Sequence, residues 1–262
     1  ETFGRYTAGM SSLTDPRARV RPISEPVPAA LVGTPAGAVF AEMARMNDGE
    51  RHTRLRAGVE ARIAGLDEAR LADAAQTAAG LLARELDAQP IAAARDGFAE
   101  RFPLYALLAA LGVPRERIPA LFPGARAFAR GISANASELE AAAAAPAARA
   151  LLDAFEEALP GRGFSERAND VGFMFQSYEA MSVLLARAIA ASADSPEQVE
   201  RLAAAEPPIP RTRRFFADEP VPVELAATPF GEGSHACPGK RVALVLCALG
   251  VRCAREATRA PS

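Results

Sequence analysis

The sequence predicts a mainly α-helical fold in one domain, with minimal β-structure. Alanine, leucine, arginine and glutamate, which favour helices, recur at helical spacing through most of the 262 residues. Half of the residues are hydrophobic, which is enough for one substantial core. Only residues 209–225 clearly indicate extended chain.

Composition and charge exclude several classes of function. A net charge of -2 favours neither a nucleic-acid partner nor an anionic membrane surface. No apolar run reaches the roughly 20 residues of a membrane-spanning helix, so we expect a cytoplasmic protein. The three cysteines do not suggest a disulfide framework, because two of them fall within the last apolar segment.

The chain begins with a segment that resists helix formation. Residues 1–36 contain five prolines, so we predict an extended arm laid over the core. The remaining residues, 37–262, then form the helical domain. Residues 37–46 carry apolar side chains at helical spacing, and a polar break before His52 starts a new helix.

Four further features predict the helical framework. Residues 68–88 form an amphipathic helix with one apolar stripe. A later helix stops at Gly112, which is followed closely by proline. Residues 138–158 show an alanine-rich helical pattern that we expect to break at Pro146. Residues 169–191 are the longest apolar stretch and predict a helix buried on most sides.

A basic pair marks the helix that contains His52. His52 and Arg56 are four residues apart, so they share one helix face and can converge on one anion. A solvated basic surface is the alternative interpretation.

The turn-rich loop of residues 228–241 is the main candidate for chemistry. It leads into an apolar helix, so Cys237 is expected just before the helix N-terminus, where free N–H groups favour a thiolate. A thiolate is the form that binds metal. Glycines allow the backbone to approach a flat group, and Phe230 can cover the sulfur. The alternative is an ordinary turn with a packed cysteine.

The filled positions of this loop resemble the haem-thiolate loop of the cytochrome P450 superfamily. They are Phe230, Gly231, Gly233, His235, Cys237 and Gly239. The helix that ends in Leu-Gly-Val-Pro, residues 111–114, is similar to a helix of bacterial members as well. The resemblance implies haem b, iron protoporphyrin IX, with Cys237 as the axial iron ligand and His235 as a partner of a haem propionate. Such a thiolate favours O–O cleavage.

The same resemblance implies further haem contacts. The His-Thr-Arg-Leu-Arg run assigns His52 and Arg56 to the propionates. Arg214 follows a Pro-Pro-Ile segment at the spacing of another propionate-binding arginine, with Arg213 as the reserve candidate. Both histidines of the chain thus belong to this set.

The sequence also departs from the superfamily pattern. Glu179 matches an acid of the helix that crosses the haem, but Ala180 stands where a threonine is expected. Alanine cannot donate a hydrogen bond to iron-bound oxygen. A surface charge is the alternative for Glu179. The Glu-x-x-Arg helix expected before Pro207 is missing, and few residues separate Arg214 from the loop. We therefore expect a short, truncated member that has lost this helix and the meander.

The leading hypothesis is a haem-thiolate oxidoreductase, a monooxygenase or a peroxygenase. It would insert oxygen into, or dehydrogenate, a small or medium organic substrate, using a ferredoxin-type electron donor or peroxide. A non-catalytic haem-binding sensor and a redox-neutral haem enzyme are the alternatives. A third is a cysteine-dependent hydrolase or transferase that uses Cys237 and His235. We also expect a homodimer, because pairing would bury area that a reduced frame leaves open.

Overall fold

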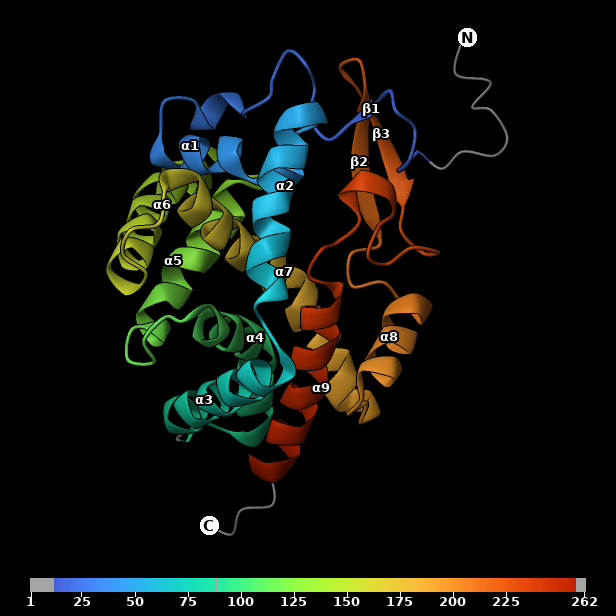
Figure 1. Ribbon diagram of the computed structural model, residues 1–262. Helices are drawn as coiled ribbons and strands as arrows, with labels where there is room; N and C mark the ends of the chain where they lie inside the picture. Colours follow the sequence, from blue (N-terminus) through green and yellow to red (C-terminus); the bar gives the residue numbers. More distant parts are fainter. Residues whose placement is uncertain (1–11, 88, 258–262) are drawn as a thin grey trace.

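The computed structural model describes residues 12–87 and 89–257 and shows a mainly helical protein with one small sheet (Figure 1). The helices are α1 Pro35–Glu42, α2 Gly49–Ala64, α3 Glu68–Leu86, α4 Ile91–Leu111, α5 Ile118–Gly131, α6 Glu138–Ala158, α7 Phe164–Ala191, α8 Pro196–Ala205 and α9 Lys240–Ala257. The strands are β1 Ala18–Arg19, β2 Arg211–Phe216 and β3 Glu219–Glu224. The predicted mainly α fold class is confirmed.

Helix α7 lies at the centre of the helical layer, with α4 and α9 packed against it (Figure 1). Helix α3 packs in turn against α4 and α9. The predicted apolar stripe of α3 faces this core, and all its members are buried: Leu71, Ala74, Ala75, Ala78, Leu81, Leu82 and Leu86. Burial of this stripe, rather than helix propensity alone, is what stabilises α3.

The sheet lies beside the helical layer and includes part of the N-terminal arm (Figure 1). Its order is β1-β2-β3, and both pairs are antiparallel. The arm strand pairs Ala18 with Phe216 and Arg19 with Phe215. The amide of Ser24 donates to Asp218 Oδ1 at 3.1 Å, in the turn between β2 and β3. The arm is thereby fixed to the sheet, while residues 1–11 lie outside the described residues.

The predicted helix stop after α4 is confirmed. Gly112 adopts a left-handed conformation with φ of 94°, and its amide donates to Ala109 O at 3.0 Å. This geometry satisfies carbonyls at the end of α4 and is open mainly to glycine.

The expected break at Pro146 was wrong, because α6 runs through it. Proline removes one backbone hydrogen bond, but Pro146 is exposed and the opposite face of α6 packs tightly on α5. A Cβ built on Gly131 would lie only 2.5 Å from the Ala144 side chain. This close packing holds the helix together across the proline.

The segment before the sheet has no Glu-x-x-Arg pattern, as the sequence indicated. Helix α8 occupies this position and packs against α7 and α9, with Val199 and Ala203 buried. The Ser195 side chain caps it by accepting from the amide of Gln198 at 3.4 Å. None of the helices in the described ranges is long and apolar enough to cross a membrane.

Candidate functional site

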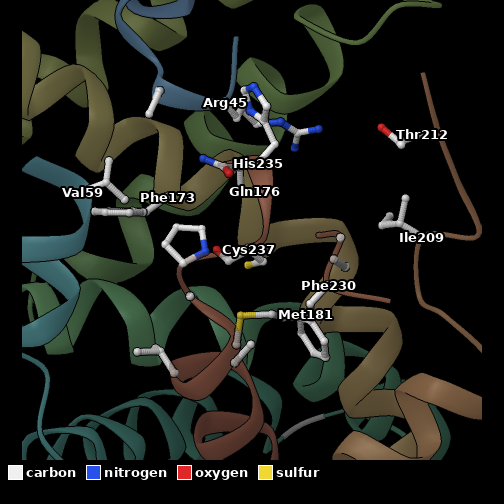
Figure 2. Close-up of a pocket in the computed structure, with 18 of the residues that line it drawn as sticks. Arg45, Val59, Phe173, Gln176, Met181, Ile209, Thr212, Phe230, His235 and Cys237 are labelled. Carbon is white, nitrogen blue, oxygen red and sulfur yellow. The ribbon is translucent and has the colours of Figure 1, made fainter. Parts of the chain in front are cut away.

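The candidate site is a cavity of about 310 Å³ between α2, α7, the start of α9 and strand β2. This volume falls in the range of roughly 300–1,000 Å³ that is typical of small-molecule sites. Figure 2 shows Arg45 and His235 at one end, Met181 at the other and Cys237 between them. Apolar side chains make up most of the lining and come from α2, α7, α9 and the segment before β2: Val59, Ile63, Phe173, Met181, Leu184, Ile209 and Val242.

The loop before α9 is folded back on itself by backbone hydrogen bonds. The amide of Cys237 donates to Phe230 O at 2.7 Å, and the amide of Gly231 donates to Thr228 O at 2.8 Å. Gly231 and Gly233 have φ of 68° and 67°, a left-handed conformation that favours glycine. The motif glycines therefore set the turn that carries Cys237 to the cavity.

The Cys237 thiol keeps accessible surface although protein surrounds it, because it faces the cavity. Burial raises the pKa of this thiol, while a hydrogen bond from the Gly239 amide and the charges of Arg45 and Arg56 oppose the rise. The backbone N–H at the start of α9 thus favours the thiolate as expected, but in the metal-free thiol burial outweighs it. A metal ion that binds the sulfur would displace the proton.

Arg56 ties helix α2 to the cysteine loop. Its Nη1 donates to Ala236 O at 2.6 Å and to Ser234 O at 3.1 Å, on either side of His235. Its Nε also pairs with Glu60 Oε1 at 2.7 Å. Arg56 thus reaches the predicted site, and its described contacts are with the loop backbone and one carboxylate.

The two histidines predicted for the site lie together. The ring centroids of His52 and His235 are 4.1 Å apart. Burial lowers the pKa of His52, and the nearby His235 and Arg56 lower it further. Both rings therefore lie where an anion can contact them at once.

His235 is held by Asp48, which was not among the residues predicted from the sequence. His235 Nε2 lies 3.2 Å from Asp48 Oδ1, and the amide of Val20 donates to Asp48 Oδ2 at 3.1 Å. Burial alone would raise the pKa of Asp48, but the hydrogen bonds from His235 and Val20 hold it below its usual range. The sequence feature that could have pointed to Asp48 is its position four residues before His52.

Two arginines complete the charged end of the cavity. Arg214 is buried on β2, where Nη1 donates to Arg213 O at 3.1 Å. Burial lowers the pKa of Arg214, against the charge of Asp48. Arg45 was not predicted from the sequence and lies in the short 3-10 turn Ala44–Met46, with its guanidinium 5.4 Å from the ring centroid of Phe175. The sequence feature that could have pointed to Arg45 is its position as an arginine within the apolar run before His52.

The wall formed by α7 carries little polar chemistry. Ala180 lines the cavity beside Gln176 and Ser177. Gln176 Nε2 donates to Gly172 O at 3.1 Å, and the Ser177 hydroxyl donates to Met174 O at 3.2 Å. Glu179 is exposed and is not part of the lining, so the structure does not bring this predicted residue to the site.

The charges that line the described cavity are all basic. Four arginines and both histidines contribute to it, and the described lining includes no aspartate or glutamate: Arg45, Arg56, Arg213, Arg214, His52 and His235. Among the residues described, no group of three or more His, Cys, Asp or Glu could hold a metal ion. The site therefore combines one cavity-facing thiol with an apolar space and a basic end.

Comparison with solved structures identifies the fold. P450BioI, solved in complex with an acyl carrier protein ligated to hexadec-9Z-enoic acid, superposes with a TM-score of 0.71 at 16% identity, over 92% of this chain and 81% of that one. PksS, a cytochrome P450 of the bacillaene polyketide synthase of Bacillus subtilis 168, gives a TM-score of 0.65 at 15% identity, over 92% and 78%.

A third structure is similar to the same extent. The cytochrome P450 CREJ, in complex with (4-ethylphenyl) dihydrogen phosphate, gives a TM-score of 0.64 at 12% identity, over 94% of this chain and 81% of that one. Comparisons with family models and with curated proteins gave no match. The chain therefore has the fold of the cytochromes P450, which confirms the resemblance seen in the sequence at the level of fold.

Proposed function

We propose that the protein is a haem-thiolate oxidoreductase with Cys237 as the axial iron ligand. The observation that carries the proposal is the position of the Cys237 thiol, which faces an apolar cavity whose charged lining is basic. Haem has a flat apolar ring, an iron that takes a protein ligand and two propionates that need cationic partners when buried. The residues present fit each part of this group.

The loop supplies the contacts for the iron and one face of the ring. Cys237 would bind iron, while Phe230, Gly231 and Gly239 would line the ring around the sulfur. Gly239 lies next to the sulfur, since a Cβ built there would be at an ordinary contact distance of 3.9 Å from the Cys237 sulfur. Haem b fits, since it needs no covalent attachment to a second cysteine.

The basic end supplies the contacts for the propionates. His52, Arg56, Arg214 and His235 would together hold the two carboxylates. Asp48 would position His235, and the loop carbonyls would position Arg56. Pairing with carboxylates would offset the cost of burying this much positive charge.

When bound, haem with a thiolate ligand supplies oxidation chemistry that draws on electron density from sulfur. The surrounding chain would position an organic substrate and limit the access of water. Neither Ala180 nor the outward-facing Glu179 can pass a proton into the cavity. A peroxygenase mode, in which peroxide brings its own protons, therefore suits this wall better than a monooxygenase mode that depends on a ferredoxin-type donor.

The same wall favours one alternative function. A haem protein that senses a ligand, or one that runs a redox-neutral reaction, has no need of proton delivery to oxygen. The apolar Ala180 is the observation behind this second candidate.

The test is haem loading followed by turnover. We expect one haem per chain, and oxidation of a panel of small apolar substrates with added peroxide. A Cys237→Ala variant should lose this activity. The non-catalytic alternative holds if the protein binds haem and two results are found. Peroxide destroys the haem without forming product, and oxygen with an electron donor forms no product either.

A further inference from the structure

Two arginines of the cavity lining, Arg45 and Arg213, make no side-chain hydrogen bond or ion pair among the described residues. The Arg45 guanidinium contacts the ring of Phe175 and interacts electrostatically with Cys237 and Arg214. Arg56, in contrast, binds two loop carbonyls and Glu60. Arg45 therefore has all its donors available to a ligand.

The Arg45 side chain keeps accessible surface and lines the cavity, and desolvation by the surrounding protein is the largest cause that lowers its pKa. A guanidinium nevertheless stays charged in proteins. An unpaired charge that the surrounding protein desolvates is costly, so an anion that reaches Arg45 would gain a strong, charge-assisted interaction.

Counting charges separates Arg45 from the proposed haem contacts. The two propionates already have four candidate partners, two on α2, one on the loop and one on β2, namely His52, Arg56, His235 and Arg214. The two propionates thus leave Arg45 and Arg213 over. Of the two, Arg45 lies beside the α7 wall, with its guanidinium 5.4 Å from the ring centroid of Phe175.

We propose that Arg45 binds the carboxylate of an organic acid substrate and so selects anionic over neutral substrates. This inference rests on the proposed function, because it concerns the substrate of the same site. The planar guanidinium donates two parallel hydrogen bonds to a carboxylate. Thr212 also lines the cavity, with its side chain pointing into it in Figure 2, and its hydroxyl is a further donor at this end.

The rest of the lining defines the rest of the substrate. Away from the basic end, Val59, Phe173 and Met181 present apolar surface (Figure 2). An acid with a hydrocarbon body would therefore place its carboxylate at Arg45 and its apolar part against these side chains.

The experiment compares matched acids and alcohols as ligands of the haem-loaded protein. Straight-chain carboxylates and the alcohols of equal length are titrated, and the change of the Soret band reports binding. We expect the acids to bind roughly tenfold to a hundredfold more tightly than the alcohols. Arg45→Met, which keeps much of the side-chain volume, should abolish this preference, and Arg45→Lys should retain part of it.

Two controls keep the interpretation clear. Arg54→Met removes the same charge from the exposed face of α2 and should leave the preference unchanged. Haem content and the spectrum of the reduced, carbon monoxide-bound protein should be the same in wild type and in Arg45→Met.

Three results would overturn the inference. In the first, the wild type binds alcohols as well as acids. In the second, Arg45→Met weakens both ligand classes equally. In the third, Arg45→Met loses haem while the remaining holoprotein keeps its preference, which would assign Arg45 to a propionate. If no variant takes up haem, the proposed function fails, and calorimetric titration of the haem-free wild type and Arg45→Met with the same acids still decides the role of Arg45.

Discussion

The two walls of the cavity differ in how much chemistry they carry. The cysteine loop presents a thiol, and the neighbouring α2 contributes Arg56, which binds the loop carbonyls. The α7 wall presents Ala180 between side chains whose polar groups are turned to the helix backbone. Under the proposed function, this difference predicts that haem binding and oxygen activation can be separated, because the residues that would bind haem are present and the α7 wall has no side chain that could pass a proton.

The largest effect is expected from Arg56, which joins α2 to the cysteine loop. Replacement by methionine would remove two hydrogen bonds to the loop and leave its carbonyls without that donor. We expect the free energy of unfolding to fall by about 2–3 kcal/mol and haem to dissociate faster. Denaturant titration and haem transfer to a scavenger protein measure the two effects. If Arg56→Met lowers the free energy of unfolding no more than exposed Arg54→Met does, Arg56 does not hold the loop in the way its hydrogen bonds indicate.

The next largest effect is expected from Ala180→Thr, on the α7 wall of the cavity. A hydroxyl placed there could donate into the cavity, so turnover driven by oxygen and an electron donor should rise roughly tenfold or more. Peroxide-driven turnover should change little. Val183→Thr adds a hydroxyl to the exposed face of α7 and serves as the control. Equal rates in the two variants would show that α7 does not limit oxygen-dependent turnover.

The pair of histidines predicts a smaller, pH-dependent effect. The pKa of His52 is lowered on folding, so the unfolded chain takes up a proton first as the pH falls. The stability from the neutral ring is complete above its ordinary pKa of 6.5 and is lost as the pH falls below it. Thermal unfolding should therefore show a smaller loss below this pH in His52→Gln than in wild type.

Haem should modify this pH dependence. A propionate beside His52 would raise the pKa of the ring, so the loss of stability on acidification should shrink once haem is added. An identical pH profile with and without haem would place the propionates away from His52.

Local patterns explain which features could be predicted from the sequence. The apolar stripe of α3, the left-handed stop at Gly112 and the loop that carries Cys237 each depend on a few neighbouring residues. Features that depend on distant pairing were missed. Asp48 meets His235 across 187 positions, and α6 continues past Pro146 because of its packing on α5.

The outward position of Glu179 follows from the periodicity of the helix. A helix turns about 100° per residue, so the cavity-lining residues of α7 share one side of the helix and Glu179 falls outside that side: Phe173, Gln176, Ser177, Ala180, Met181 and Leu184. Once Gln176, Ser177 and Ala180 line the cavity, Glu179 must point elsewhere, and it is exposed. The family pattern suggested a role for this acid that helix geometry alone could have questioned.

The most direct test of haem ligation by Cys237 is the absorption spectrum of the reduced, haem-loaded protein under carbon monoxide. We predict a strongly red-shifted Soret band, the sign of a thiolate opposite carbon monoxide, which disappears in Cys237→Ala. A wild-type spectrum without this shift, or the same shifted band in Cys237→Ala, would contradict the assignment of Cys237 as the iron ligand.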